Sequence, residues 1–225
     1  MSASKKKISG VSPSDGSLDL PRATGASLDQ SVRKRRDPEV LQRGILAIDP
    51  GSHQTGWAWW PTAASLVPAE AGVISGGNGT VAERALVVKA ALKEVYATRV
   101  PMLGSIAIEK PIPYHRFKAI ALETTYSELS AWARTLHRKR GRTPGLIVST
   151  YNNKAVKAVV NPKYGEFGRE GSAKDKLMAG VCSSLNTDYR LYPEDAIDAI
   201  AIGLLHLQII RQEILIWQLL SEIED

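Results

Sequence analysis

Four carboxylates in this sequence have neighbours and spacings that suit metal-dependent chemistry. They are Asp49, Glu109, Asp195 and Asp198. Asp49 follows an apolar run and precedes a Pro-Gly pair, which indicates a buried strand that ends in a turn. Glu109 ends a second short apolar run. Asp195 and Asp198 are three residues apart, so we expect them on one face of a helix, with Cβ atoms about 5–6 Å apart.

Carboxylates that gather in one place repel one another unless some are protonated or cations lie among them. Oxygen ligands without His or Cys suit Mg²⁺ or Mn²⁺, and two such ions roughly 4 Å apart would stabilise the attacking and leaving oxygens of phosphodiester hydrolysis. The acids differ in how well a purely structural role explains them, and Glu109 is the hardest to explain in that way. Asp49 could be a turn residue, and Asp195 could interact with a helix dipole, while Glu194 beside it is expected to be solvated.

The elements that must position these acids predict an α/β domain with a five-stranded mixed sheet flanked by helices. The strands are expected at 44–49, 55–60, 70–75, 105–109 and 146–148, the first three as an antiparallel meander and the last two parallel. The helices are expected at 80–99, 117–139, 152–160, 172–185 and about 193–222, with a glycine-rich loop over 161–171. If the last helix packs on the sheet, all four acids converge at one edge.

Tryptophans within the second strand have a structural interpretation. Alternation along the strand predicts Trp57 and Trp59 on one face of the sheet, against helices, and Trp60 on the other face. Packing in the core explains them better than stacking on bases. His206 lies about two turns beyond Asp198 on the same helix, which is too far for direct metal ligation.

Composition limits the class of protein. Residues 1–43 hold nine Lys/Arg against five Asp/Glu and few apolar residues, which predicts a disordered basic tail before one domain over 44–225. The single cysteine excludes an internal disulfide framework and a cysteine-based zinc cluster, and fits a reducing, cytoplasmic compartment. No uninterrupted apolar run approaches the roughly 18 residues that a membrane span needs. The net charge of +6 favours an anionic partner such as nucleic acid.

Three motifs resemble, in their order and spacing, those of the RuvC-type Holliday junction resolvases, homodimeric endonucleases of the RNase H-like superfamily. The motifs are Ile-Asp-Pro-Gly-Ser with Thr-Gly (48–52, 55–56), Ile-Ala-Ile-Glu (106–109) and Asp-Ala-Ile-Asp-Ala-Ile-Ala (195–201). The resemblance covers about 44–207. It implies that the four acids are catalytic metal ligands, with Asp49 between two Mg²⁺ or Mn²⁺ ions. It also implies paired, symmetric cleavage of four-way DNA junctions in recombination and repair, by a bacterial or phage-type enzyme near the nucleoid.

The same resemblance implies DNA-binding residues. The candidates for phosphate contacts are Lys154, Lys157, Lys174 and Lys176, although each could be an ordinary surface lysine. Family members place an aromatic residue just after the strand-end glutamate. Here Lys110 follows instead, so Tyr114 is the candidate for contact with junction bases. A homodimer is expected, with helix 117–133 as a candidate interface or an internal core helix; no residue identifies a branch-migration partner.

Three other functions share some of these features. The opening Asp-Pro-Gly-Ser motif also resembles the first phosphate loop of actin-like ATPases, but those enclose a nucleotide between two such domains, which this chain is too short to supply. A nucleic-acid-binding module without activity is disfavoured because all four acids are present. An RNase H-like nuclease for other branched or RNA-containing substrates keeps the same site and differs only in substrate.

Overall fold

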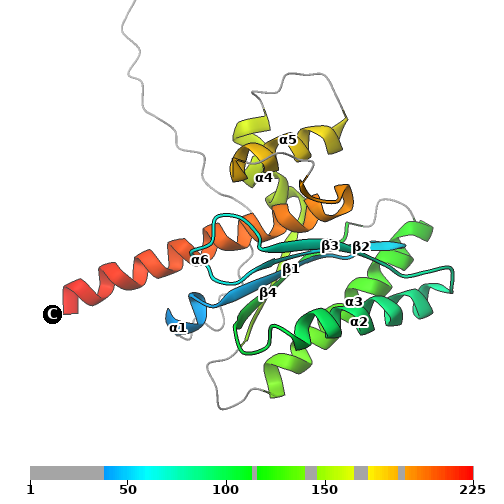
Figure 1. Ribbon diagram of the computed structural model, residues 1–225, viewed down its shortest axis with the longest axis horizontal. Helices are drawn as coiled ribbons and strands as arrows, with labels where there is room; N and C mark the ends of the chain where they lie inside the picture. Colours follow the sequence, from blue (N-terminus) through cyan, green and yellow to red (C-terminus); the bar gives the residue numbers. More distant parts are fainter. Residues whose placement is uncertain (1–37, 113–115, 140–145, 165–171, 187–190, 225) are drawn as a thin grey trace, which may run out of the picture. The chain divides into compact units, whose positions relative to one another are not determined.

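A computed structural model describes residues 38–112, 116–139, 146–164, 172–186 and 191–224 (Figure 1). The N-terminal segment 1–37 lies outside the described residues, so the predicted tail remains a prediction there. Residues 38–41 were also expected in that tail. The structure instead has a short helix there, α1 (Pro38–Leu41), with Val40 and Leu41 buried, because Leu41 packs into a core cluster.

The five predicted strands form one mixed sheet. They are β1 (Gly44–Asp49), β2 (Gln54–Trp60), β3 (Glu70–Ser75), β4 (Leu103–Lys110) and β5 (Ile147–Asn152). The order across the sheet is β3-β2-β1-β4-β5. The first three strands are antiparallel neighbours, and β4 and β5 run parallel to β1. The predicted fold class is therefore confirmed.

The helices begin and end close to the predicted residues. They are α2 (Val81–Ala97), α3 (Arg116–Lys139), α4 (Asn153–Tyr164), α5 (Ala173–Leu185), the 3₁₀ turn η4 (Glu194–Ala196) and α6 (Ile197–Glu224). Thr80 caps α2 and Ser172 caps α5, each through a capping box with the residue at N3. The loop predicted from residue 161 is wrong at its start, because α4 continues to Tyr164.

The sheet separates two hydrophobic clusters. Helices α2 and α3 cover one face, and α4, α5 and α6 lie on the other (Figure 1). Trp57 and Trp59 belong to the cluster beneath α2 and α3, whereas Trp60 is fully buried under α6, as the alternation predicted. A Cβ atom on Gly203 of α6 would lie 2.2 Å from the Trp60 ring, so this glycine lets the helix approach the sheet closely.

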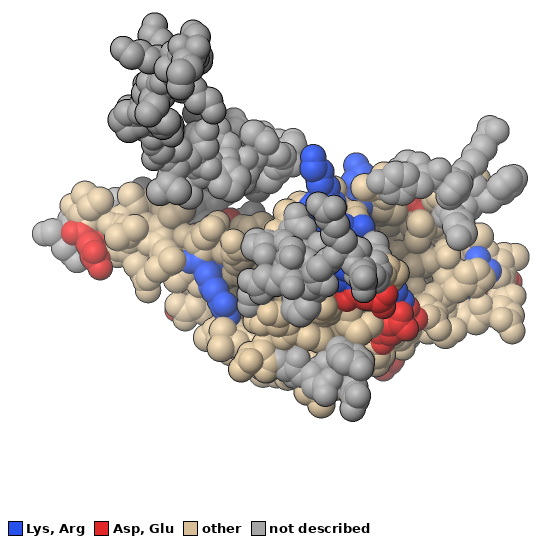
Figure 2. Space-filling view, turned by 90° about the horizontal axis from the view of Figure 1, so that it is seen from above, with Lys and Arg blue, Asp and Glu red and all other residues tan. Residues whose placement is uncertain are grey.

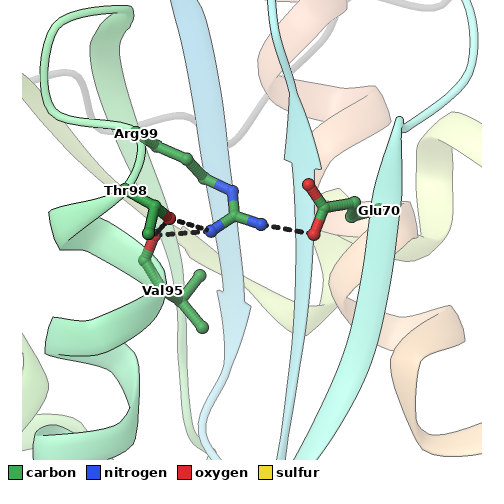
Figure 3. Close-up of polar contacts among 4 residues, drawn as sticks. All are labelled: Glu70, Val95, Thr98 and Arg99. Atoms are coloured by element: carbon green, nitrogen blue, oxygen red, sulfur yellow. Dashed lines mark hydrogen bonds and ion pairs between the residues drawn. The ribbon is translucent and has the colours of Figure 1, made fainter.

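An arginine links the end of α2 to the outer strand (Figure 3). Arg99 pairs with Glu70 of β3 and donates hydrogen bonds of 2.7 Å to the carbonyl of Val95 and the hydroxyl of Thr98. Its guanidinium carbon lies 5.4 Å from the centroid of the Trp57 ring, within the range of a cation–π contact. This cluster has one cation and one carboxylate, and two neutral oxygens accept from the guanidinium, whose Nε is buried without a hydrogen-bond partner among the described residues.

Helix α6 continues well beyond the sheet edge that it covers. By length and composition alone the helix could cross a membrane, but half of its most apolar stretch is buried inside the protein, as in a core helix. Its C-terminal half exposes a row of large apolar side chains: Leu215, Ile216, Leu219, Leu220 and Ile223. Packing on the sheet therefore explains the hydrophobicity of the first half of the helix only.

Candidate active site

The sheet places two of the predicted acids side by side. Asp49 is the last residue of β1, and Glu109 is the last but one of β4. The two strands are parallel neighbours with Ile48 opposite Ile108, so the residue that follows on each strand lies at the same edge. Glu109 is 8% exposed although it carries a carboxylate, which calls for compensating partners.

The other two acids come to this edge through a close backbone contact. Gly56 of β2 lies opposite Asp49 in the antiparallel pair. A Cβ atom on Gly56 would lie 2.3 Å from the carbonyl oxygen of Asp195, so only glycine at this position permits the observed packing of η4 on the strand. Asp195 is thereby held next to the strand that pairs with β1.

Asp195 and Asp198 do not share one regular helix, contrary to the sequence-based prediction. Asp195 lies in the 3₁₀ turn η4, and Asp198 lies in the first turn of α6. The amide of Ala196 donates to the carbonyl of Pro193 at 2.9 Å, an i→i+3 bond that tightens the start of the helix. The two acids still border the same site, because Asp195 raises the pKa of Asp198.

Burial and mutual repulsion dominate the charges of this site. Burial raises the pKa of Asp49 well above its usual range, and the carboxylates of Glu109 and Asp198 raise that pKa further. Asp195 adds to the rise, and the ammonium of Lys174 opposes it. The carboxyl group at the end of β1 therefore lies within the field of all three other predicted acids.

The same neighbours act on the remaining buried acids. Burial is the first cause that raises the pKa of Glu109 and that of Asp198. Asp198 raises the pKa of Glu109 further, whereas the Lys157 ammonium lowers the pKa of both acids. Lys174 also lowers the pKa of Asp198. The prediction that four acids converge at one edge agrees with this pattern of coupling.

Lys174 of α5 occupies the more exposed side of the acid group. Its Nζ lies 2.9 Å from Asp195 Oδ1 and 3.1 Å from Glu194 Oε1. The hydrogen bond to Asp195 is the first cause that raises the pKa of Lys174, although the side chain is 41% exposed. Glu194 was expected to be solvated, and at 62% exposure it is, but it also helps to hold this lysine.

Whether these residues suit a metal depends on both chemistry and position. The donors are carboxylate oxygens with an excess of negative charge, as hard divalent cations require. As the side chains stand, no three His, Cys, Asp or Glu side chains of the described ranges form a group able to hold one ion. Lys174 occupies Oδ1 of Asp195, so a cation that takes this oxygen needs the ion pair to open.

The predicted DNA-binding residues differ in their exposure and in their influence on the acids. Lys154 and Lys157 are exposed on α4, and Lys157 is close enough to the acids to affect them. Lys176 is partly buried on α5. Tyr114 lies outside the described residues. Figure 2 shows basic side chains close to acidic ones near the middle of one face.

Sequence reasoning missed the contact of Asn153 with Glu109 and the contact between Tyr151 and His206. Asn153, the first residue of α4, donates from Nδ2 to Glu109 Oε1 at 2.8 Å. The hydroxyl of Tyr151 and Nδ1 of the buried His206 are 2.6 Å apart, which connects the end of β5 to α6. The signal available in the sequence was position, because polar residues at the end of a strand parallel to β4 reach the edge where Glu109 lies.

Comparisons with known proteins agree with this architecture. A family model described as "Crossover junction endodeoxyribonuclease RuvC" matches residues 45–206. Thermus thermophilus RuvC in complex with a Holliday junction substrate matches with 19% identity over 75% of this chain and 96% of that chain, at a TM-score of 0.54. A second Thermus thermophilus RuvC structure matches with 20% identity, the same coverages and the same TM-score.

A more distant solved structure has a similar fold. The yeast mitochondrial Holliday junction resolvase Ydc2 matches with 10% identity over 82% of this chain and 85% of that chain, at a TM-score of 0.50. At such identities the structural likeness supports the fold alone. The comparison with curated proteins gave no match.

Proposed function

Because a family model matches more than half of its length, the chain belongs to the RuvC family of crossover junction endodeoxyribonucleases, and from this premise we propose which residues carry its activity. The protein is a divalent-metal-dependent endonuclease that resolves Holliday junctions. We propose that Asp49, Glu109, Asp195 and Asp198 are its catalytic acids. The observation that carries this assignment is their placement at one end of the sheet. Asp49 and Glu109 end neighbouring parallel strands, Gly56 holds the turn of Asp195 against β2, and Asp198 follows in the first turn of α6.

We propose Mg²⁺ or Mn²⁺ as the ions, two in each active site. Bound there, they would supply an activated water and would stabilise the charge on the leaving oxygen. Asp49, which is influenced by every other acid, would hold the centre of the site. Glu109 would flank it from β4, and Asp195 and Asp198 would flank it from η4 and α6. The net negative charge of these residues favours cation binding.

The lysines near the acids are proposed to bind the DNA backbone. Lys157 and Lys174 influence the acids and lie on α4 and α5, next to the sheet edge. A phosphate that enters the site would draw Lys174 away from Asp195, which then becomes available to a metal ion. Lys154 and Lys176 would add contacts that do not depend on base sequence. We propose that this takes place in the cytoplasm, near the nucleoid.

The assignment is tested on a synthetic four-way junction. With Mg²⁺ or Mn²⁺, full-length protein should convert the junction into nicked duplexes. Asp49→Asn should reduce cutting on the order of 10³-fold, since removing even one transition-state donor from an enzyme costs about 10²–10³-fold. Binding of the junction in EDTA, measured by gel shift, should change less than about threefold, because DNA affinity comes mainly from phosphate contacts.

Two outcomes would contradict the proposal. Equal cutting of linear duplex and junction would remove the preference for four-way DNA. Cutting that survives both Asp49→Asn and Glu109→Gln would remove these acids from the chemistry. Flap and replication-fork substrates in the same assay address cleavage of other branched DNA.

We propose that the active form is a homodimer, since two symmetric nicks need two sites. Helix α3 remains the candidate interface, and Ile120 on it is 56% exposed. Sedimentation velocity at micromolar concentration should show twice the 24.4 kDa mass of the chain. A monomer at that concentration would count against the proposal. Ile120→Glu should shift the protein toward the monomer if α3 forms the interface.

A further inference from the structure

Two adjacent asparagines at the junction of β5 and α4 have different hydrogen-bond partners. Asn152 Oδ1 accepts from the amide of Ala155 at 2.8 Å, which is a capping bond for the start of α4. Asn153 Nδ2 donates to Glu109 Oε1, also at 2.8 Å, across 44 residues of sequence. Asn152 therefore caps the helix, whereas Asn153 donates to the acid.

The sheet explains how Asn153 reaches Glu109. Glu109 of β4 lies opposite Tyr151 of β5 in the parallel register. The chain turns into α4 two residues later, so Asn153 lies just past the strand end beside the acid. The bond between Tyr151 and His206 connects this corner to α6, which carries Asp198. The segment that carries Asn153 is therefore held by the pairing of β5 with β4 and by the contact of Tyr151 with α6.

The bond has a directional consequence for the carboxylate. An asparagine NH₂ group only donates, and an ionised carboxylate only accepts, so the pair favours the charged form of Glu109 in a buried place. The bond engages one of the two oxygens of Glu109. The orientation of the carboxylate plane is then set before any cation binds, which lowers the conformational cost of binding.

We infer that Asn153 is a positioning residue, which holds one oxygen of Glu109 so that the carboxylate meets the divalent ion in a fixed orientation. This inference rests on the proposed role of Glu109 as a metal ligand. Outer-shell partners of metal ligands typically contribute about 10–100-fold in metal affinity or activity. Asn153 does not touch the reacting atoms in this scheme; it acts through Glu109.

The test compares variants of the two asparagines in the full-length protein. Asn153→Ala should weaken Mg²⁺ binding, measured by isothermal titration calorimetry without DNA, by about 10-fold or more. It should also raise the Mg²⁺ concentration for half-maximal junction cleavage by a similar factor. Saturating Mg²⁺ should restore most of the cleavage rate, because the acids themselves are intact. Asn153→Gln, which keeps an amide donor, should recover part of the affinity.

Asn152→Ala is the matched control. It removes the cap of α4 and should lower the denaturation midpoint, while the Mg²⁺ dissociation constant stays within about twofold of wild type. If Asn153→Ala fails to fold, Asn153→Leu and Asn153→Gln give the same comparison, with the Leu variant expected to bind Mg²⁺ more weakly than the Gln variant because leucine has no group to donate to Glu109.

The outcomes separate this inference from the proposed function. Wild-type Mg²⁺ affinity in the Asn153 variants, with junction cleavage by the wild type intact, would overturn the positioning role alone. Equal losses of affinity in the Asn152 and Asn153 variants would also overturn it, since the effect would then come from α4. A wild-type protein that neither binds Mg²⁺ nor cuts the junction would overturn both.

Discussion

Two cation–carboxylate clusters in this protein differ in how completely their charges are matched. In the first, Arg99 pairs with Glu70, donates to two neutral oxygens and lies over tryptophan rings. In the second, Lys174 contacts Glu194 and Asp195 and influences two further acids. The first cluster is neutral as a unit, and the second keeps a surplus of negative charge.

This difference indicates which cluster is built for a ligand. The charges of Arg99 and Glu70 balance each other at the edge of a hydrophobic cluster, and the ion pair connects the end of α2 to β3 (Figure 3). The acid cluster remains costly, because burial and like charges oppose ionisation of Asp49, Glu109 and Asp198. Divalent cations would remove that cost. We therefore expect substitutions in the acid cluster to affect mainly cleavage and substitutions in the Arg99 cluster to affect mainly the free energy of unfolding.

The largest expected effect is on cleavage. Asp195→Asn should reduce four-way junction cutting by about 10²-fold or more, whereas Glu70→Gln should leave it within about twofold. Both changes remove one carboxylate that pairs with a cation, so the comparison controls for the loss of an ion pair. Single-turnover kinetics with saturating Mg²⁺ would measure both. Similar losses in the two variants would mean that the ion pairs, rather than the surplus charge, matter.

The second effect is on the free energy of unfolding. Arg99→Met should lower it by about 2 kcal/mol, because the hydrogen bonds of a charged side chain that is only 12% exposed are lost and Glu70 loses its cation. Lys174→Met should change it by less than about 1 kcal/mol when Mg²⁺ is present, since the pair is half exposed. Urea denaturation at pH 7 would measure both. A larger loss for Lys174 than for Arg99 would reverse the assignment of the structural cluster.

The smallest effect is on the pH dependence of stability without metal. The folded-state pKa values of Asp49, Glu109 and Asp198 lie above the unfolded ones, so the folded protein binds protons more tightly. Their contribution is therefore most favourable at acidic pH and decreases as pH rises from the unfolded pKa through the folded pKa. Asp49→Asn in EDTA should unfold at higher urea than wild type at pH 7, with the difference shrinking toward pH 4.

Urea midpoints of both proteins from pH 4 to 8 would measure that trend. Saturating Mg²⁺ should abolish the advantage of Asp49→Asn, since the wild type then gains the binding energy of the ions. An Asn variant that is less stable than wild type in EDTA at pH 7 would contradict the idea that the acid cluster is strained by its own charge.

Much of the fold could be predicted from local patterns. Apolar runs followed by turns predict the strands. Thr80 and Ser172 begin helices through capping boxes, which depend only on residues close in sequence. The start of the last helix could not be predicted, because Asp195 enters a 3₁₀ turn that depends on contact with Gly56 of another strand. Tertiary contact decided that geometry.

Only part of the candidate site could be predicted from local sequence patterns. Asp49 and Glu109 end strands, so their convergence follows from a parallel sheet. Asn153 gave no local signal, since its partner is 44 residues away and the bond depends on the register of β4 and β5. Lys174 was predicted to bind phosphate, and its contact with Asp195 became visible only once α5 and η4 were placed together.

Gly56 has no Cβ atom, and this absence sets the distance between the sheet and the turn that carries Asp195. Because the carbonyl of Asp195 would lie 2.3 Å from a methyl group there, the distance between the acid-bearing turn and the sheet is fixed by backbone against backbone. Such a spacing does not vary with side-chain rotation. The separation of the carboxylates on β1 from those on η4 and α6 is thus a property of the main chain, and side chains adjust only the final approach to a bound ion.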